Sequence, residues 1–469
     1  MNFKGKQILV LGAGRSGMGV AHVLGSLGAV VTLNDYKKIE LSPEDTTLLS
    51  ESGVTIITGY QENDLLDTTD LVVVSPGIAL TIPILEEAKR RHIDIVGEVE
   101  IAYQVSKAPI LGVTGTNGKT TTTTLLAEAM AMTGKPIKVG GNIGQSLSEE
   151  AVQIPADGYL VAELSSYQLE SVNEFRPVGA IVLNITPDHL QRHKTMEAYQ
   201  AAKEQIFKNQ RPEDVTVLNI DDPIVAGMAN RVPGKVLCIS QTKRVTDGAY
   251  FLDQTCYAAR GGESEAVITT SEIHIPGHHN IENILAVIAL AYHLGVEAKQ
   301  LHTVIAQFQG VEHRIEKVST IEGVTFYNDS KATNTDSAIK ALEAFTKPVI
   351  LLAGGYDKMT DLTDFMKAVA HGTKALVLMG AAAKRFGEAA QSAGVTQIYY
   401  VNSMGEAVAK GFELASPDDI VLLSPACSSF DWYHCFEERG DDFKHEVKTL
   451  AQSIEDMRRS VASTEKGAL

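Results

Sequence analysis

One glycine-rich segment constrains the fold more than any other feature of this sequence. Residues 112–121 read Gly-Val-Thr-Gly-Thr-Asn-Gly-Lys-Thr-Thr and join an apolar run that starts at residue 109 to a helical pattern over 122–132. Backbone N–H groups of such a turn can surround a polyphosphate, while Lys119 neutralises its terminal oxygens and Thr120 reaches Mg²⁺. We therefore predict a nucleoside triphosphate site, although Val113 stands where the strict pattern has its first glycine. The residues of this site are Gly115, Thr116, Asn117, Gly118, Lys119, Thr120 and Thr121.

Short apolar runs alternate with helical patterns over most of the 469 residues. This alternation predicts parallel sheets covered by helices, and the length exceeds what one hydrophobic core usually serves. We expect an α/β protein of three domains: a Rossmann-like domain at 1–97, a central domain at 98–310 with a P-loop ATPase-like, mostly parallel sheet, and a second Rossmann-like domain at 311–469. The strands within 242–272 cannot be placed from the pattern.

The composition argues against several functions. With 41 basic and 58 acidic side chains the formal charge is −17, which repels nucleic acid and anionic lipid at long range. No apolar segment approaches the ~20 residues that cross a bilayer, and the longest, 284–291, predicts a buried helix. The four cysteines lack paired or metal-finger spacing, so we expect reduced packing residues. Because the N-terminus shows no signal-peptide pattern, we expect a cytoplasmic protein.

A second glycine cluster, 12–17, follows the first predicted strand, and Asp35 ends the next one. The pattern is typical of a dinucleotide-binding turn. The same turn serves any diphosphate, so its ligand could be NAD or another nucleotide diphosphate. A tight turn required only by sterics also remains open.

Candidate metal and phosphate ligands follow the strands of the second block. Glu163 closes the apolar run 159–162, and His189 follows the next strand. Ligands of open α/β sheets gather at this edge, so both side chains could face Mg²⁺ or phosphate. Simpler interpretations are an exposed carboxylate at Glu163 and a helix cap or surface role at His189. Taken alone, Asn142 fits an ordinary loop and Lys203 a solvated helical lysine.

The third block supplies Arg314 and then the segment 328–334, directly after a strand. A cation and a carboxylate at such a strand end could hold phosphate and ribose hydroxyls. The alternative is a helix N-cap with charged neighbours.

These motifs, in this order, resemble the Mur ligase family over essentially the whole chain. The matching segments are Gly-Thr-Asn-Gly-Lys-Thr-Thr at 115–121, Gly-Asn-Ile-Gly at 141–144, Glu-Leu-Ser-Ser at 163–166, His-His-Asn at 278–280 and His-Arg at 313–314. Within the family, Asn-Asp-Ser-Lys-Ala-Thr-Asn at 328–334 and Ser-Pro-Ala-Cys-Ser-Ser-Phe-Asp at 424–431 resemble the branch that adds D-glutamate.

The resemblance implies ATP as co-substrate and two Mg²⁺ ions. Its catalytic residues would be Lys119, Glu163, His189 and Lys203, and its metal ligands Thr120, Glu163, His189 and Lys203, the last as a carbamate. Beyond the glycine loop, ATP would contact Asn283, Arg314 and Asp329. The first glycine turn would become a uridine diphosphate site. UDP-N-acetylmuramoyl-L-alanine would be held by Arg15, Ser16, Asp35, Tyr36, Ser75, Gly77, Asn142 and His189, and D-glutamate by Lys331, Thr333, Lys358, Ser429 and the backbone near Phe436.

The reaction implied by the resemblance transfers the γ-phosphoryl group of ATP to the alanyl carboxylate. The amine of D-glutamate then displaces phosphate from the acyl phosphate and forms an amide, a step of peptidoglycan precursor synthesis. Two other classes fit part of the sequence. An NAD-dependent oxidoreductase would leave Lys119 and Thr120 without a role, and a nucleotide sensor would not need Glu163, His189 and Lys203 together.

Overall fold

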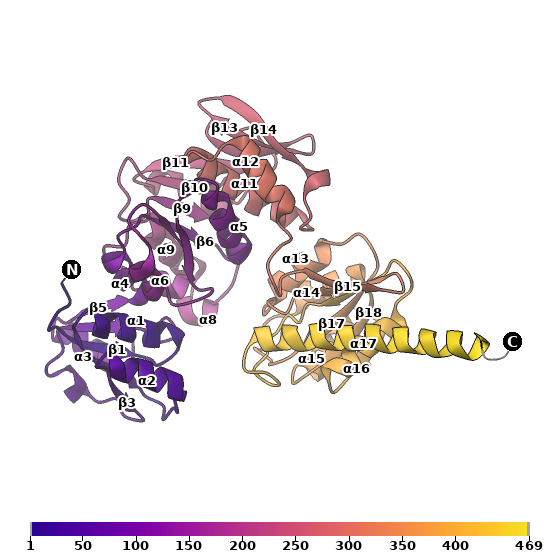
Figure 1. Ribbon diagram of the computed structural model, residues 1–469, viewed down its shortest axis with the longest axis horizontal. Coiled ribbons are helices and arrows are strands. Elements are labelled where there is room, and N and C mark those ends of the chain that lie inside the picture. The colour runs from indigo at the N-terminus through magenta and orange to yellow at the C-terminus, as the bar shows by residue number, and fades with distance from the viewer. Residues whose placement is uncertain (1, 467–469) are drawn as a thin grey trace. The chain divides into compact units, whose positions relative to one another are not determined.

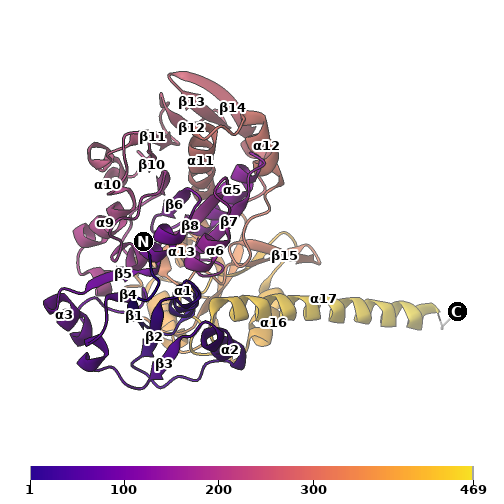
Figure 2. The same ribbon diagram turned by 60° about the vertical axis from the view of Figure 1, so that its left-hand side comes forward.

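The computed structural model describes residues 2–466 (Figures 1 and 2). It contains three sheets, mostly parallel and covered by helices, which confirms the expected α/β class with three sheets. The described chain forms two compact units. One comprises the residues up to Ile273 together with Ile281–Gln307, and the other His274–Asn280 together with the residues from Phe308 on.

The first sheet is entirely parallel, in the order β3-β2-β1-β4-β5. Its strands are β1 (Gln7–Leu11), β2 (Val30–Asp35), β3 (Thr55–Thr58), β4 (Leu71–Val74) and β5 (Asp94–Gly97). The accompanying helices are α1 (Arg15–Ser26), α2 (Pro43–Glu51), η1 (Asn63–Leu66), α3 (Pro83–Arg90) and α4 (Glu98–Val105). Because the strand order reverses between β1 and β4, the turns after these two strands meet at the switch point where open sheets bind ligands.

The second sheet has the order β14-β13-β12-β11-β10-β9-β6-β8-β7. Its strands are β6 (Ile110–Thr114), β7 (Ile137–Gly141), β8 (Tyr159–Glu163), β9 (Gly179–Val182), β10 (Val215–Asn219), β11 (Lys235–Ser240), β12 (Gly248–Leu252), β13 (Thr255–Arg260) and β14 (Glu263–Thr269). Its helices are α5 (Lys119–Ala131), α6 (Leu147–Gln153), α7 (Ser166–Leu169), α8 (Leu190–His193), α9 (Met196–Glu204), η2 (Gln205–Phe207), α10 (Pro223–Ala226), η3 (Ala229–Arg231), η4 (Thr270–Glu272), α11 (His278–His293) and α12 (Ala298–Gln307).

The segment that could not be placed from sequence, 242–272, holds the antiparallel strands β12, β13 and β14. The first four residues of β14 are all exposed at the edge of the sheet, so they lack the alternation that marks a half-buried strand. By contrast, the run 284–291 in α11 is buried, as predicted. Within the described residues, no helix is both long and apolar enough to cross a membrane, and the four cysteines are free thiols.

The third sheet has the order β15-β16-β20-β17-β18-β19, and only the β15–β16 pair is antiparallel. Its strands are β15 (Glu316–Ile321), β16 (Val324–Asn328), β17 (Val349–Gly354), β18 (Thr373–Met379), β19 (Ile398–Tyr400) and β20 (Ile420–Leu423). Its helices are α13 (Thr335–Glu343), α14 (Thr363–Gly372), α15 (Ala383–Ser392), α16 (Met404–Leu414) and α17 (Phe436–Lys466), the last running past the end of its unit in Figures 1 and 2. Because β16, β20 and β17 are parallel neighbours, the loops after them share one edge.

Candidate active site

The central glycine loop joins β6 to α5. Gly115 and Gly118 have φ of +154° and +83°, a region that L side chains rarely adopt. A side chain at Gly118 would also come within 2.2 Å of Asn283 Oδ1, so the Asn283 side chain would have to move. The backbone N–H of Asn117 donates to Asn184 Oδ1 at 2.9 Å, which ties the loop to the segment after β9. The loop is therefore fixed on the helix N-terminus, the arrangement that favours bound phosphate.

Two lysines converge on one carbonyl of this loop. Lys119 Nζ donates to Gly115 O at 3.0 Å and to Thr116 O at 2.8 Å, and Lys203 Nζ donates to Gly115 O at 2.7 Å. Lys203 is 1% exposed, so the interpretation as a solvated lysine is wrong. Lys203 lies one helical turn beyond the buried Tyr199 on α9, with its Nζ 4.7 Å from the centroid of that ring, so it shares the inward face of the helix. Burial, and then the charge of Lys119, hold the pKa of Lys203 well below its ordinary value.

Glu163 at the end of β8 is 1% exposed, which contradicts the interpretation as an exposed carboxylate. Its Oε1 accepts a hydrogen bond from Asn142 Nδ2 at 2.7 Å. Its Oε2 is buried and has no hydrogen-bond partner within residues 2–466. A buried carboxylate oxygen without a donor is unfavourable unless a cation meets it, and Mg²⁺ prefers oxygen ligands. Glu163, with the hydroxyl of buried Thr120 at the start of α5, therefore fits a magnesium site.

His189 is the N-cap residue of α8, with a φ of 55°, so the helix-cap interpretation holds for its backbone. Its side chain makes no capping bond and is 41% exposed. The ring centroid lies 4.9 Å from that of Tyr167, and Nε2 lies 3.5 Å from Asp188 Oδ2. A half-exposed imidazole beside a carboxylate could bind a metal ion or phosphate.

A cleft of about 670 Å³ unites the two glycine turns. Predicted site residues that line it are Arg15, Ser16, Ser75, Gly77, Lys119, Asn142 and His189. Arg15 Nη1 donates to Gly144 O at 2.9 Å, and Ser75 Oγ donates to Gly12 O at 3.0 Å, so the cleft walls are cross-linked.

Two residues predicted for the same substrate are not among the described residues that line this cleft. The Asp35 carboxylate accepts hydrogen bonds from Ala13 N at 3.0 Å and Lys37 N at 2.9 Å, so it shapes the turn. Tyr36 is 74% exposed. Sequence reasoning also missed Tyr167 and Gln168, which line the cleft. The capping box of α7, in which Gln168 pairs with Ser165, was a signal that could have placed them on a helix start.

In the other unit, Asp329 follows β16 and is 1% exposed. Its Oδ2 accepts from Ser424 Oγ at 2.7 Å and its Oδ1 from Ile315 N at 3.3 Å. Burial raises its pKa to about 6, and the Arg314 guanidinium acts in the opposite direction. The N-cap expected in this segment is Asn334, whose side chain accepts from Ser337 N, and Asp329 lies outside the helix. Asp329 is thus a buried carboxylate rather than a helix cap.

The residues predicted to receive D-glutamate lie on the loops at this same sheet edge. Lys358 Nζ donates to Thr333 O at 3.0 Å, which joins the loops after β17 and β16. Lys331 Nζ lies 5.3 Å from the ring centroid of Phe436. Ser429, on the loop after β20, is 2% exposed. The fold therefore gathers side chains that could bind carboxylates.

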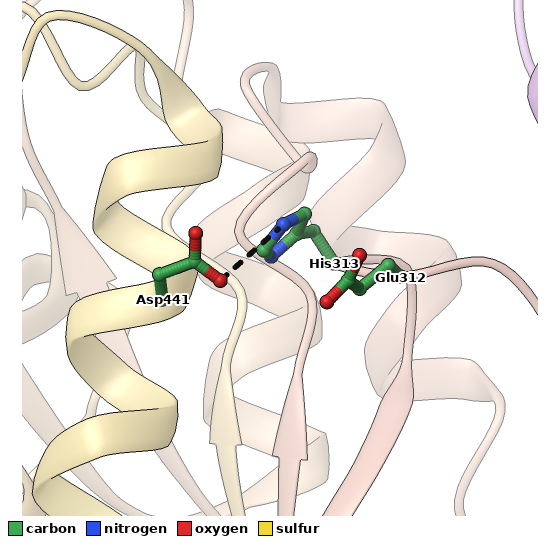
Figure 3. Close-up of side chains that lie close together, drawn as sticks. All are labelled: Glu312, His313 and Asp441. Atoms are coloured by element: carbon green, nitrogen blue, oxygen red, sulfur yellow. Dashed lines mark ion pairs between the residues drawn. The ribbon is translucent and has the colours of Figure 1, made fainter. Parts of the chain in front are cut away.

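Figure 3 shows Glu312, His313 and Asp441, a group whose geometry could hold a metal ion. Lys444 Nζ already forms ion pairs with Glu312 and, at 3.0 Å, with Asp441. His313 Nδ1 lies 3.0 Å from Asn328 Nδ2, which fixes the ring. Because one ammonium group pairs with both carboxylates, we interpret this cluster as an ion-pair network.

The fold and the glycine loop define an α/β protein with a phosphate-binding loop at the carboxyl edge of its central sheet. Family models match residues 6–97 (Mur ligase MurD-like, N-terminal domain), 113–291 (Mur ligase middle domain) and 313–427 (Mur ligase, glutamate ligase domain). The chain therefore belongs to the Mur ligase family.

Similar proteins include the UDP-N-acetylmuramoylalanine--D-glutamate ligases of Thermoanaerobacter sp. (strain X514) and Caldanaerobacter subterraneus subsp. tengcongensis. They are 43% and 44% identical to this chain, and each match covers 96% of the chain and 100% of the relative. Among solved structures, UDP-N-acetylmuramate-alanine ligase MurC of Thermotoga maritima superposes with a TM-score of 0.59 at 21% identity, over 95% of this chain and 99% of that one. The last likeness shows the fold alone.

Proposed function

We propose that this chain is a ligase that adds D-glutamate to UDP-N-acetylmuramoyl-L-alanine, with conversion of ATP to ADP and phosphate, in cytoplasmic peptidoglycan precursor synthesis. The names of the full-length relatives support the substrates. The observation in the structure that carries the proposal is the convergence of Lys119, Lys203 and Glu163 at the glycine loop. Lys119 also lines the cleft of the first glycine turn, so ATP and a nucleotide-linked substrate would meet there. We keep the division into domains 1–97, 98–310 and 311–469 as part of this proposal.

The charged groups at the loop have separate tasks in this proposal. Lys119 stabilises the phosphoryl group as it passes to the alanyl carboxylate, because charge placed where the transition state develops it lowers the barrier. Thr120, Glu163, His189 and Lys203 would hold two Mg²⁺ ions, which supply charge neutralisation at the phosphate oxygens when bound. Lys203 serves as a ligand only as a carbamate. Its lowered pKa favours the neutral amine, the form that reacts with carbon dioxide.

The acyl phosphate is then attacked by the amine of D-glutamate. The tetrahedral oxyanion collapses to the amide and releases phosphate, and it needs the same positive charges while it exists. In this proposal ATP is bound by Asn283, Arg314 and Asp329. D-Glutamate is bound by Lys331, Thr333, Lys358, Ser429 and the Phe436 backbone. The uridine diphosphate substrate is bound by Arg15, Ser16, Asp35, Tyr36, Ser75, Gly77, Asn142 and His189.

The test is an omission assay of phosphate release. The purified chain is supplied with ATP, Mg²⁺, UDP-N-acetylmuramoyl-L-alanine and D-glutamate, and each component is left out in turn. We expect sustained phosphate release only in the complete mixture, with one amide product formed per phosphate. Phosphate release at the same rate with and without D-glutamate, or binding of ATP without turnover, would contradict the proposal.

A further inference from the structure

Arg439 is a buried cation at the edge of the third sheet where the acceptor amino acid is proposed to bind. It is the fourth residue of α17 and is 2% exposed. Nε donates to Ser330 Oγ at 2.9 Å, and Nη2 donates to Ser330 O at 2.7 Å and Cys427 O at 3.0 Å. All three acceptors are uncharged. Nη1 is buried and has no hydrogen-bond partner in the described part of the chain.

This one guanidinium contacts all three acceptor loops. Ser330 precedes Lys331 on the loop after β16, and Cys427 lies two residues before Ser429 on the loop after β20. On the loop after β17, a side chain at Gly355 would come within 3.1 Å of Nη1, so the absence of one lets the guanidinium approach that backbone. Lys358 stands three residues further along the same loop.

The network continues to the start of α17. Ser330 Oγ, which accepts from Arg439 Nε, donates in turn to Phe436 O at 2.8 Å. Arg439 and Phe436 lie in the same helical turn, so the guanidinium and the first carbonyl of α17 hold Ser330 from two sides. A change at Arg439 would therefore reach every segment that carries a proposed acceptor residue.

The buried charge has a second consequence. Burial lowers the pKa of Arg439 to about 10, so the group still carries its proton at neutral pH. In a low-dielectric interior a fixed charge acts over a longer range than in water. The hydrogen-bond acceptors of Arg439 are neutral, and the carboxylates of Asp431 and Asp329 act on it through space rather than by a hydrogen bond. A carboxylate of the acceptor bound at this edge would be attracted by the same positive charge.

We infer that Arg439 positions the three acceptor loops and makes the site selective for an amino acid with a carboxylate side chain. The inference rests on the proposed function and adds a residue that acts through Ser330, Cys427 and the Gly355 backbone. A guanidinium that served only as a structural clamp would affect stability without changing which acceptor is preferred. Acceptor preference therefore separates the two roles.

The experiment compares Arg439→Gln, Arg439→Lys and Lys374→Gln with the parent chain. Lys374 donates to the buried Asp419 at 2.6 Å near the start of β18, at the opposite edge of the same sheet, so its loss controls for destabilisation of this unit. D-Glutamate and D-glutamine compete at equal concentration with ATP and the UDP-linked substrate. Products are separated by charge, and the KM values for D-glutamate and ATP are measured in parallel.

For Arg439→Gln we expect the KM for D-glutamate to rise ~30-fold and the preference for D-glutamate over D-glutamine to fall at least ~10-fold, with the KM for ATP within ~3-fold of the parent. Arg439→Lys keeps the charge but not the fork of donors, so the preference should return to within ~3-fold of the parent while the KM stays raised. Lys374→Gln should change neither the acceptor preference nor the KM for D-glutamate.

An unchanged preference in folded Arg439→Gln, or an equal loss in Lys374→Gln, would overturn the inference. If Arg439→Gln does not fold, Ser330→Ala tests the positioning of the loops, because it removes the acceptor of Nε and the donor to Phe436 O while the guanidinium stays. A KM for D-glutamate that Ser330→Ala leaves unchanged would then overturn it. If the parent chain itself forms no product with D-glutamate, the proposed function is wrong. That outcome is distinct from failure of the inference, because it is seen before any variant is compared.

Discussion

The carboxyl edges of the central and the C-terminal sheets carry different kinds of buried charge. At the central edge, among the described residues, one oxygen of Glu163 has no hydrogen-bond partner, and the amino group of Lys203 contacts a carbonyl and the face of a ring. At the C-terminal edge, Asp329 and Arg439 are enclosed by hydrogen bonds that connect loops. We therefore assign catalysis to the charged groups of the central edge. We assign recognition of the acceptor amino acid to the connected loops of the C-terminal edge. Substitutions at the first should lower kcat, and at the second raise the acceptor KM.

The largest effect is expected for Lys119→Ala. Loss of a charge that acts on the transferring phosphoryl group should lower kcat about 10³-fold, while thermal unfolding stays near that of the parent. Lys138→Ala is the control, since Lys138 pairs with Glu150 at 2.8 Å outside the loop. A near-normal kcat in folded Lys119→Ala would show that the central edge does not supply the catalytic charge, which would contradict the distinction between the two edges.

Lys203→Ala should lower kcat by about 10²-fold or more, because the carbamate that would hold Mg²⁺ is lost. Short carboxylic acids such as formate or acetate should restore part of the activity by occupying the vacated space. Lys119→Ala, tested with the same acids, should not respond. If Lys203→Ala and bicarbonate depletion both leave activity unchanged, the carbamate is not part of the mechanism.

Lys358→Ala should raise the KM for D-glutamate ~30-fold and leave the KM values of ATP and the UDP-linked substrate nearly unchanged, since the side-chain carboxylate of the acceptor would lose a charged partner. For the parent, D-glutamine and D-alanine should be poor acceptors for the same reason. Lys347→Ala, at an exposed ion pair with Asp418, is the control. Equal incorporation of D-alanine and D-glutamate would argue against a carboxylate pocket.

The smallest expected effect concerns the pH dependence of stability. Burial raises the pKa of Asp329 to about 6, so the folded chain binds more protons than the unfolded chain between about pH 4 and 6. Stability from this group is therefore lost as the pH rises through that window, on the order of 3 kcal/mol. The difference in unfolding free energy between the parent and Asp329→Asn should decrease from pH 4 to pH 7.

The contribution of Asp357 to stability should depend on pH in the opposite direction. The Arg385 guanidinium, which donates to both of its oxygens, lowers the pKa of Asp357. Its contribution to stability is present above the unfolded pKa and is lost as the pH falls through the folded pKa. Denaturant titrations should show the stability difference between the parent and Asp357→Asn decreasing as the pH falls below the ordinary aspartate pKa, whereas the difference for Asp329→Asn decreases as the pH rises from 4 to 7. Parallel curves for the parent and Asp329→Asn would show that Asp329 is not a strained buried carboxylate.

The sequence allowed prediction of whatever depends on strands and their ends. Glu163, Asp329 and the glycine turns were placed at sheet edges because parallel strands end together, and the three sheets followed from the alternation of elements. The burial of Lys203 was not predictable from its helix, since it depends on how α9 packs against a loop far away in the chain. Arg439 gave no signal either, because a charged residue in the first turns of a helix is normally solvated. Contacts between distant segments decide both cases.

The most direct test of the account follows one oxygen atom. UDP-N-acetylmuramoyl-L-alanine labelled with ¹⁸O in its alanyl carboxylate is converted with ATP and D-glutamate, and the released phosphate and the UDP-linked product are examined by mass spectrometry. An acyl phosphate must carry one carboxylate oxygen away when the amine displaces phosphate, so we predict one ¹⁸O atom in each phosphate and one D-glutamyl residue in each product. Phosphate free of ¹⁸O would contradict activation of the carboxylate, the central claim of this account.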